Sequence, residues 1–216
     1  MPTRVKICGL KTAGTVSAAL DSGADYVGFV FYPRSPRSVA LADAASLRGA
    51  AIGRAAAVAL VVDADDARIG EIAAAVRPDM FQLHGSETPE RTRQIKAMTR
   101  LPVMKAISVA TAADALRALD YADAADLILF DAKPAPGDTS ALPGGNGIPF
   151  DWRAINEVAD RVPFILSGGL TCDNVAEAIR LTKAKAVDVS SGVESAPGVK
   201  DAELIRRFIR AAKGVG

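Results

Sequence analysis

Eight short apolar runs recur along the chain and are separated by longer segments with helical spacing. The runs are 4–8, 26–31, 56–62, 80–83, 102–107, 127–130, 163–166 and 186–190. They are nearly continuous in apolar character, which is typical of strands covered on both faces, and such strands belong to parallel sheets. In the last intervening segment Leu204, Ile205 and Phe208 share one helix face. The pattern predicts strands that alternate with helices.

The chain has 216 residues, enough to bury one large core. Eight strands alternating with about eight helices predict an α/β protein, a single-domain (β/α)8 TIM barrel over residues 1–216. One helix start is marked by Thr111 and Asp114, which form a capping-box pattern. After the sixth strand, residues of about 132–150 carry too many prolines and glycines for a helix. We expect a lid loop there.

Charge and cysteine content narrow the class of partner. Lys and Arg total 26 against 25 for Asp and Glu, so the net charge of +1 offers no field for nucleic acid or an anionic membrane. We therefore expect a small-molecule partner. Cys8 and Cys172 form neither a CxxC pair nor a Cys/His cluster, so no metal site is expected. With no secretory leader or membrane span in view, we expect a cytoplasmic protein. The sequence does not set the oligomeric state, and we favour a monomer.

Lys6 and Cys8 lie on the same face of the first predicted strand, because side chains alternate along a strand. If that face is the barrel interior, an ammonium group lies near the thiol. A cation there favours thiolate and would lower the thiol pKa from about 8.5 toward neutrality. Cys8 is then a candidate base or nucleophile. The alternative is a small buried residue with no chemical role, which is common for a free cysteine.

Other polar candidates follow later strands, where the active sites of such barrels gather. Asp131 directly follows the sixth run, at the end of the predicted strand, and is a candidate catalytic residue, although an aspartate that caps a turn is at least an equal alternative. His84 follows the fourth run and is the one histidine of the chain. We expect it to have a structural or hydrogen-bonding role, since no carboxylate neighbour is evident from the sequence.

Two sets of residues could hold anionic groups of a substrate. Glycine-bearing turns at 167–169 and 190–192 follow the seventh and eighth strands, where barrels commonly bind phosphate with backbone N–H groups. Ordinary tight turns are the alternative. After the second strand, Arg34 and Arg37 lie in a proline-stiffened loop, and a guanidinium can hold a carboxylate bidentately. A solvated surface position suits Arg34 better than Arg37.

Taken together, these segments resemble a known family. "VKICGL", "GFVFYPRSPRSV", "FQLHGSE", "LILFDAKP", "LSGGLTCDNVAEAI" and "VDVSSGVESAPGVKD" occur in the order found in phosphoribosylanthranilate isomerases of tryptophan biosynthesis. The resemblance covers nearly the whole chain, and "KICG" with "FDAKP" is specific in combination. Asn146 in "GGNG" departs from the threonine that is more usual there, which affects only the predicted lid.

The resemblance implies an Amadori rearrangement of N-(5-phosphoribosyl)anthranilate to 1-(2-carboxyphenylamino)-1-deoxyribulose 5-phosphate, without a cofactor or metal. It implies that Asp131 is the acid that protonates the furanose ring oxygen and that Cys8 is the base that removes the sugar C2 proton. It further implies a set of substrate contacts. These are Gly168, Gly169, Ser191 and Gly192 for the phosphate, Arg37 for the anthranilate carboxylate, and Asp188 for a hydrogen bond, with a structural role equally open for Asp188.

Three other functions remain possible at this point. A sugar-phosphate isomerase of histidine biosynthesis does analogous chemistry on a similar barrel, but that family is expected to carry an aspartate where this chain has Cys8. A Schiff-base aldolase would use Lys105 on the fifth strand and would leave Cys8 and Arg37 without a task. A non-catalytic phosphate-binding barrel would bind its ligand without turnover, and an intact pair of Cys8 and Asp131 argues against it.

Overall fold

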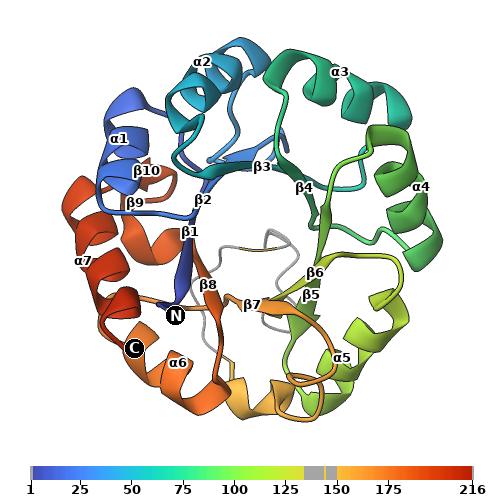
Figure 1. The fold of residues 1–216 in the computed structure, drawn as a ribbon, viewed down its shortest axis with the longest axis vertical. Coiled ribbons are helices and arrows are strands. Elements are labelled where there is room, and N and C mark those ends of the chain that lie inside the picture. The colour runs from blue at the N-terminus through green and yellow to red at the C-terminus, as the bar shows by residue number, and fades with distance from the viewer. Residues whose placement is uncertain (1, 134–143, 145–149, 216) are drawn as a thin grey trace.

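Eight parallel strands close into a barrel in which each strand pairs with its sequence neighbours, and β8 returns to β1 (Figure 1). The computed structural model describes residues 2–133, 144 and 150–215. The strands are β1 Arg4–Cys8, β2 Tyr26–Val30, β3 Ala56–Val61, β4 Met80–Leu83, β5 Val103–Val109, β6 Leu127–Ala132, β7 Phe164–Leu166 and β8 Ala186–Val189. The (β/α)8 TIM barrel predicted from the apolar runs is confirmed.

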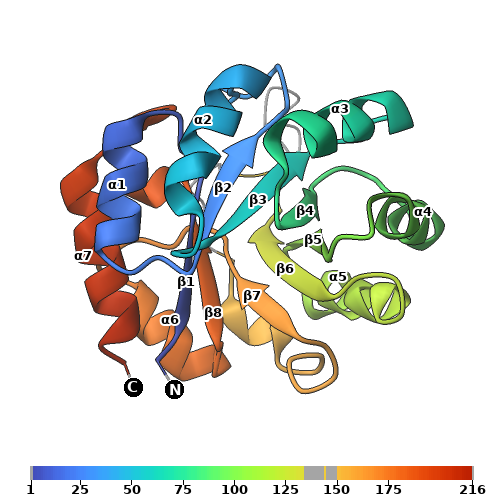
Figure 2. The same ribbon diagram turned by 45° about the horizontal axis from the view of Figure 1, so that its top comes forward.

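Helices surround the ring of strands (Figures 1 and 2). They are α1 Ala13–Asp21, α2 Leu41–Ala51, α3 Asp66–Val76, α4 Pro89–Thr99, α5 Ala112–Leu116, α6 Val175–Thr182 and α7 Ala202–Lys213, with short 3-10 helices η1 Arg117–Tyr121, η2 Trp152–Ile155 and η3 Ser191–Val193. The expected capping box of Thr111 and Asp114 begins α5. Among the described helices, none is long and apolar enough to cross a membrane.

The segment between β6 and β7 differs from the expected regular repeat. In its described residues, η2 takes the place of a full α-helix. The lid predicted at about 132–150 falls almost entirely outside the described residues. The number of full α-helices in the described part of the chain is therefore smaller than the eight that the βα repeat predicts.

The strands are apolar on both faces because each face meets a different core. Outward side chains such as Val5, Ile7 and Phe29 pack against the helices. Inward side chains in the N-terminal half of the barrel form a second cluster, which we call the barrel plug. The plug consists of Tyr26, Val58, Met104, Ala106, Leu127, Leu129, Ile165 and Ala186. Burying each large apolar side chain contributes about 1.5–3 kcal/mol, so two cores account for the unbroken apolar runs.

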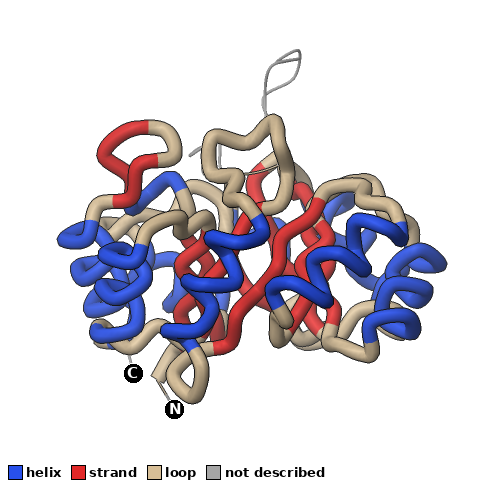
Figure 3. The backbone as a smooth tube through the Cα atoms, turned by 90° about the horizontal axis from the view of Figure 1, so that it is seen from above, coloured by secondary structure: helices blue, strands red, loops and turns tan. Residues whose placement is uncertain are grey.

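At the C-terminal end of the barrel the inward positions become polar, as they do for Cys8 on β1 and Asp131 on β6. A small antiparallel hairpin follows β8, formed by β9 Glu194–Ala196 and β10 Val199–Lys200. Figure 3 shows this hairpin on the face of the barrel opposite both chain termini. The fold therefore separates an apolar N-terminal half from a polar mouth that carries the candidate site.

Candidate active site

A pocket opens at the barrel mouth and brings together most of the residues predicted from the sequence. Cys8, Arg37, Asp131, Gly168, Gly169, Asp188 and Ser191 all line it. Gly192 lies outside the lining and has a packing role, because a Cβ there would overlap the carbonyl oxygen of Leu170. The prediction that Gly192 contributes to a phosphate site has to rely on its backbone N–H alone.

Lys6 and Cys8 both face the barrel interior, as the strand alternation predicts. The Lys6 ammonium is fully buried and donates to Oδ1 of Asp188 at 2.7 Å. Burial alone would lower the pKa of Lys6, but the charges of Asp188 and Cys8 outweigh it and raise this pKa to about 12. The ammonium therefore stays charged at neutral pH beside the thiol.

The expected lowering of the Cys8 pKa is wrong. Burial is the largest influence and raises the pKa of the thiol above its ordinary value. The charges of Lys6 and Lys200 lower this pKa, and that of Asp188 raises it, so the cations reduce the effect of burial without reversing it. A pKa above the ordinary thiol value favours the protonated form of Cys8 near neutral pH.

Room for this pair comes from Gly28 on the neighbouring strand β2. A Cβ at Gly28 would lie 3.0 Å from Sγ of Cys8 and 3.2 Å from Nζ of Lys6. Both distances are tighter than ordinary packing allows. The lack of a side chain at Gly28 on β2 therefore leaves room for the thiol and the ammonium of β1 to lie side by side.

Asp131 reaches the opposite wall of the pocket from β6 and meets His84 from β4. Nε2 of His84 lies 3.3 Å from Oδ2 of Asp131, and Nδ1 of His84 lies 3.2 Å from Nε2 of Gln82. If the Gln82 amide donates to Nδ1, the imidazole carries its proton on Nε2, facing the carboxyl group. The carboxylate neighbour of His84 that the sequence did not reveal is therefore Asp131.

Neither Lys6, which lies on β1, nor Lys133, which follows β6, pairs with Asp131. Lys6 is bound by Asp188, and Nζ of Lys133 lies 3.1 Å from Oδ1 of Asp114. Oδ1 of Asp131 accepts from the N–H of Ala132 at 2.9 Å. Among the described residues, no lysine or arginine makes an ion pair with Asp131. Protonating this carboxyl group therefore breaks no ion pair with a lysine or arginine of that part of the chain.

Arg37 is buried at the pocket edge and is oriented by Glu194 of the β9–β10 hairpin. Nε and Nη2 of Arg37 donate to the two carboxylate oxygens of Glu194, each at 2.8 Å. Burial raises the pKa of Glu194. The hydrogen bonds and positive charges of Arg37 and Lys200 outweigh burial and hold this pKa below its ordinary value. Arg37 is accordingly held in one orientation rather than solvated.

The turns after β7 and β8 offer backbone donors on a third side of the pocket. Gly168 and Gly169 have φ values of 86° and 64°. Among the described residues, neither the Gly168 N–H nor the Gly169 N–H donates a hydrogen bond to a backbone carbonyl. Ser191 adds a hydroxyl group to the same lining. Such turns suit an anion.

Lys105 does not face the pocket, which removes the geometric basis for a Schiff-base aldolase. Nζ of Lys105 donates to the Gly85 carbonyl at 2.7 Å and to Glu87 at 2.8 Å. Its strand neighbours Val103 and Ile107, on the same face, belong to the core between strands and helices. Lys105 holds the loop after β4 in place from outside the barrel.

Comparison with known proteins agrees with this geometry. The family model described as N-(5'phosphoribosyl)anthranilate (PRA) isomerase matches residues 5–211. The chain belongs to this isomerase family. It is 57% identical over 213 residues to the N-(5'-phosphoribosyl)anthranilate isomerase of Rhodopseudomonas palustris, covering 99% of this chain and 97% of that protein. It is 54% identical to the enzyme of Parvibaculum lavamentivorans, covering 99% of each.

Solved structures of phosphoribosylanthranilate isomerases have the same fold. The Thermotoga maritima enzyme superposes with a TM-score of 0.88 at 39% identity, covering 98% of this chain and 99% of that one. A second isomerase structure, in complex with reduced 1-(o-carboxyphenylamino)-1-deoxyribulose 5-phosphate, gives a TM-score of 0.85 at 38% identity, with 98% and 99% covered. Family membership removes the histidine-pathway isomerase and the non-catalytic barrel as alternatives.

Three polar residues of this phosphoribosylanthranilate isomerase site are absent from the sequence-based set. Gln82 contacts His84, while Glu194 and Lys200 form a buried ion pair at 2.6 Å beside Arg37. Gln82 lies two residues before His84, so strand alternation could have placed it on the same face. Glu194 and Lys200 lie in a segment, "ESAPGVK", whose composition is typical of an exposed turn, so the sequence carries no local signal of their burial.

Proposed function

We propose that Cys8 and Asp131 are the base and the acid of the reaction that this family performs, the conversion of N-(5'-phosphoribosyl)anthranilate to 1-(2-carboxyphenylamino)-1-deoxyribulose 5-phosphate in tryptophan biosynthesis. The observation that carries the proposal is that a thiol on β1 and a carboxyl group on β6 face one pocket from opposite walls. A substrate sugar between them would meet one group on each side.

In the first step, Asp131 donates its proton to the furanose ring oxygen. The bond from C1 to that oxygen breaks, and the nitrogen lone pair forms an iminium at C1. The absence of a lysine or arginine partner among the described residues favours this role, since a protonated Asp131 gives up no such ion pair. Nε2 of His84 lies 3.3 Å from the same carboxyl group.

In the second step, the Cys8 thiolate takes the proton from C2. The electron pair of that C–H bond forms the C1–C2 double bond and neutralises the iminium, and the resulting enol tautomerises to the ketone. The thiol first has to lose its own proton, which burial opposes by raising the Cys8 pKa. Lys6 and Lys200 favour this ionisation.

Substrate anions fit the other two sides of the pocket. We propose that backbone N–H groups of Gly168, Gly169 and Gly192, with Ser191, hold the phosphate, and that Arg37 holds the anthranilate carboxylate. Asp188 already binds Lys6 and accepts from Ser167 Oγ at 3.2 Å. Its position in the lining leaves one further hydrogen bond to substrate within its capacity.

Complementation tests the function. Expression of the chain should restore growth of a tryptophan auxotroph that lacks this isomerase, and the Cys8→Ala and Asp131→Asn variants should not. A histidine auxotroph lacking the analogous sugar-phosphate isomerase is the matched arm, and we expect no rescue there. Growth of the histidine strain alone would overturn the proposed substrate, and rescue of the tryptophan strain by Cys8→Ala would overturn the role of Cys8.

We also propose that the chain acts as a single catalytic domain, as a monomer, in the cytoplasm. Among the described residues the exposed large apolar side chains Ile52, Met98, Leu116, Leu181 and Val199 are spread over several elements, which favours a monomer. The Thermotoga maritima relative, by contrast, is described as dimeric. Molar mass from light scattering on the purified chain decides between the two states.

A further inference from the structure

The β9–β10 hairpin carries two buried charges, and neither of them gives or takes a proton in the acid–base steps. The side chains of Glu194 and Lys200 are only 5% and 2% exposed, although they come from a short hairpin at the rim of the barrel. Burying charges is costly unless they are paired and hydrogen-bonded. A hairpin with purely structural duties would be cheaper to build with apolar residues at these positions. The pair is therefore a candidate for a role in the reaction.

Glu194 connects the hairpin to the arginine that is proposed to bind the substrate carboxylate. Both of its oxygens accept hydrogen bonds from Arg37, through Nε and Nη2. The same carboxylate accepts from Gly198 N–H at 3.2 Å and from Lys200 Nζ at 2.6 Å. The plane of the guanidinium is thus fixed by an acid that is itself fixed by its own hairpin.

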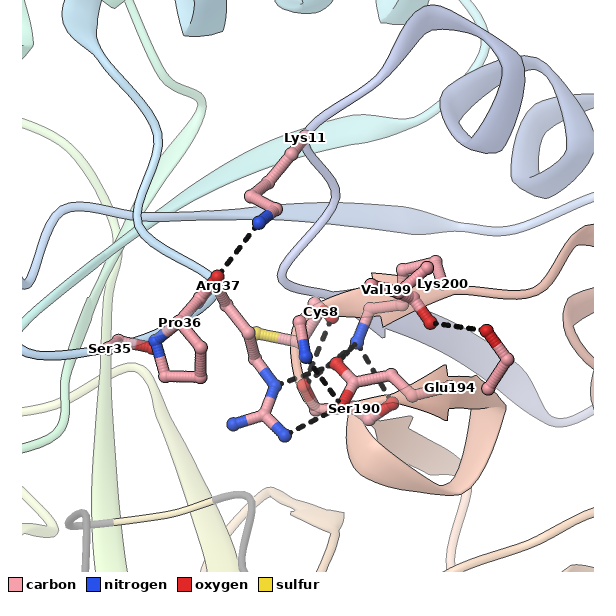
Figure 4. Close-up of polar contacts among 11 residues, drawn as sticks. Cys8, Lys11, Ser35, Pro36, Arg37, Ser190, Glu194, Val199 and Lys200 are labelled. Carbon is pink, nitrogen blue, oxygen red and sulfur yellow. Dashed lines mark hydrogen bonds and ion pairs between the residues drawn. The ribbon is translucent and has the colours of Figure 1, made fainter.

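Lys200 connects the hairpin to the end of β1. Its ammonium donates to the Ser190 carbonyl at 2.9 Å and lies 3.1 Å from the Ser190 hydroxyl. That hydroxyl donates to the backbone carbonyl of Cys8 at 3.2 Å. Figure 4 shows Arg37, Glu194, Lys200 and Ser190 gathered beside Cys8. The ammonium is therefore held two hydrogen bonds away from Cys8.

We propose that Glu194 and Lys200 are a positioning pair. Glu194 orients Arg37 toward the substrate carboxylate, and Lys200 provides a fixed cation that favours ionisation of Cys8. This inference rests on the proposed roles of Arg37 and Cys8. Neither residue of the pair needs to touch the reacting atoms.

The charges around the thiol support this division of labour. Cys8 faces Lys6 and Asp188, which neutralise each other, and also Lys200 from β10. Lys200 in turn faces Glu194 and Arg37. The charge of Lys200 lowers the Cys8 pKa against the larger effect of burial, and burial lowers the pKa of Lys200 itself.

The two members of the pair predict opposite shifts of the thiol titration. In Lys200→Met the cation is lost, so the fraction of thiolate at a given pH should fall about tenfold, which is one pKa unit. In Glu194→Gln the countercharge is lost, so the thiolate fraction should rise by a similar factor. The double variant removes both charges and should lie between the two. A merely structural role would not give shifts of opposite sign.

The ultraviolet absorbance of the thiolate, followed against pH in the substrate-free enzyme, measures these shifts. The Cys172→Ser background leaves Cys8 as the one thiol, and subtracting the Cys8→Ala titration removes tyrosine. Lys200→Arg should restore the wild-type titration. Lys96→Met is the matched control, because Lys96 is a partly exposed lysine paired with Asp126, away from the pocket. Thermal unfolding of each variant verifies that it is folded.

If Cys8 in Glu194→Gln ionises at no lower pH than in the wild type, the proposed electrostatic effect of the pair on Cys8 is overturned. This result is decisive even if Lys200→Met fails to fold. For the Arg37 part, Glu194→Gln should lower the discrimination in kcat/KM between substrate and a decarboxylated analogue about tenfold, and unchanged discrimination overturns it. Because the titration needs no turnover, it stands apart from the proposed function. Normal turnover by Cys8→Ala would refute the base, whatever the thiol titration shows.

Discussion

On the β1 and β8 side of the barrel mouth, Cys8 lies among lysines, an arginine and acids that are all paired, whereas on the β4 and β6 side Asp131 faces a single imidazole. The first wall is charged and tightly bonded. In the second wall, Gln82 Oε1 and His84 Nε2 are buried without a well-aligned hydrogen bond among the described residues.

The difference matches the opposite tasks proposed for the two walls. A base that is a buried thiol needs nearby cations to ionise, and a wall of paired charges supplies them without leaving a charge unbalanced. An acid needs to hold a proton until substrate arrives, so a lysine or arginine beside it would work against its function. The predictions below test whether the walls divide the reaction in this way.

The largest effect is expected for Cys8→Ala. It removes the base and leaves the opposite wall intact, so kcat should fall by about 10³- to 10⁴-fold, within the range typical of general bases. Product affinity should change little, because the proposed phosphate and carboxylate contacts remain. Steady-state kinetics and a product-binding titration measure the two quantities. Retention of more than about a tenth of wild-type kcat would remove Cys8 from the base role.

Asp131→Asn changes the opposite wall and should lower kcat by about 10²- to 10³-fold. The amide is nearly isosteric but cannot donate a proton of comparable acidity, so ring opening becomes rate-limiting while substrate binding is kept. Single-turnover kinetics measure the ring-opening step directly. Near-normal turnover would return Asp131 to the role of a turn cap.

Arg37→Ala should raise KM by about 10- to 100-fold, since a bidentate charged contact contributes roughly 1.5–3 kcal/mol. The variant should also lose the ability to distinguish substrate from a decarboxylated analogue. Arg34→Ala is the matched control, because Arg34 lies in the same loop and is exposed. Equal discrimination by wild type and Arg37→Ala would show that Arg37 does not bind the carboxylate.

The pH profile of kcat/KM should show the smallest change and should separate the walls most clearly. The active form pairs a protonated acid with an ionised thiol, although a carboxylic acid ordinarily titrates below a thiol. That form is a minor tautomer of the state in which the two groups share one proton. The plot of kcat/KM against pH is therefore bell-shaped, and its alkaline limb reports the pKa of the thiol. Since burial raises the Cys8 pKa, this limb should lie above the ordinary thiol value.

The residual activity of Asp131→Asn sharpens the same test. Without a titrating acid, activity should rise with pH through the Cys8 pKa and then level off, so the alkaline limb reverses its direction. The measurement is the kcat/KM profile of the variant beside that of the wild type. A variant whose activity still falls on the alkaline side would show that another group produces the limb.

Much of the architecture could be predicted because both faces of a barrel strand are buried. Each strand therefore appears in the sequence as a short, continuous apolar run. The inward orientation of Lys6 and Cys8 followed from strand alternation in the same way. The contact of His84 with Asp131 could not be predicted, since it joins the residue after β4 to β6 past the intervening β5, and neither segment carries a sign of the other.

The charge state of Cys8 shows a different limit. The sequence placed an ammonium beside the thiol correctly, but the sign of the pKa shift depends on how burial compares with several charges. Two of those neighbours, Asp188 and Lys200, come from the far end of the chain. The burial of Glu194 and Lys200 was likewise hidden, because a hairpin of polar residues and glycine is ordinarily exposed.

The barrel plug has a consequence for traffic through the enzyme. Met104, Leu129 and Ile165 fill the interior below the pocket, so that end of the barrel offers no exit. Substrate and product therefore both use the pocket opening at the barrel mouth, and product has to leave the pocket before substrate can bind. Accumulating product should then act as a competitive inhibitor, which makes the flux through this step sensitive to how quickly the next enzyme removes it.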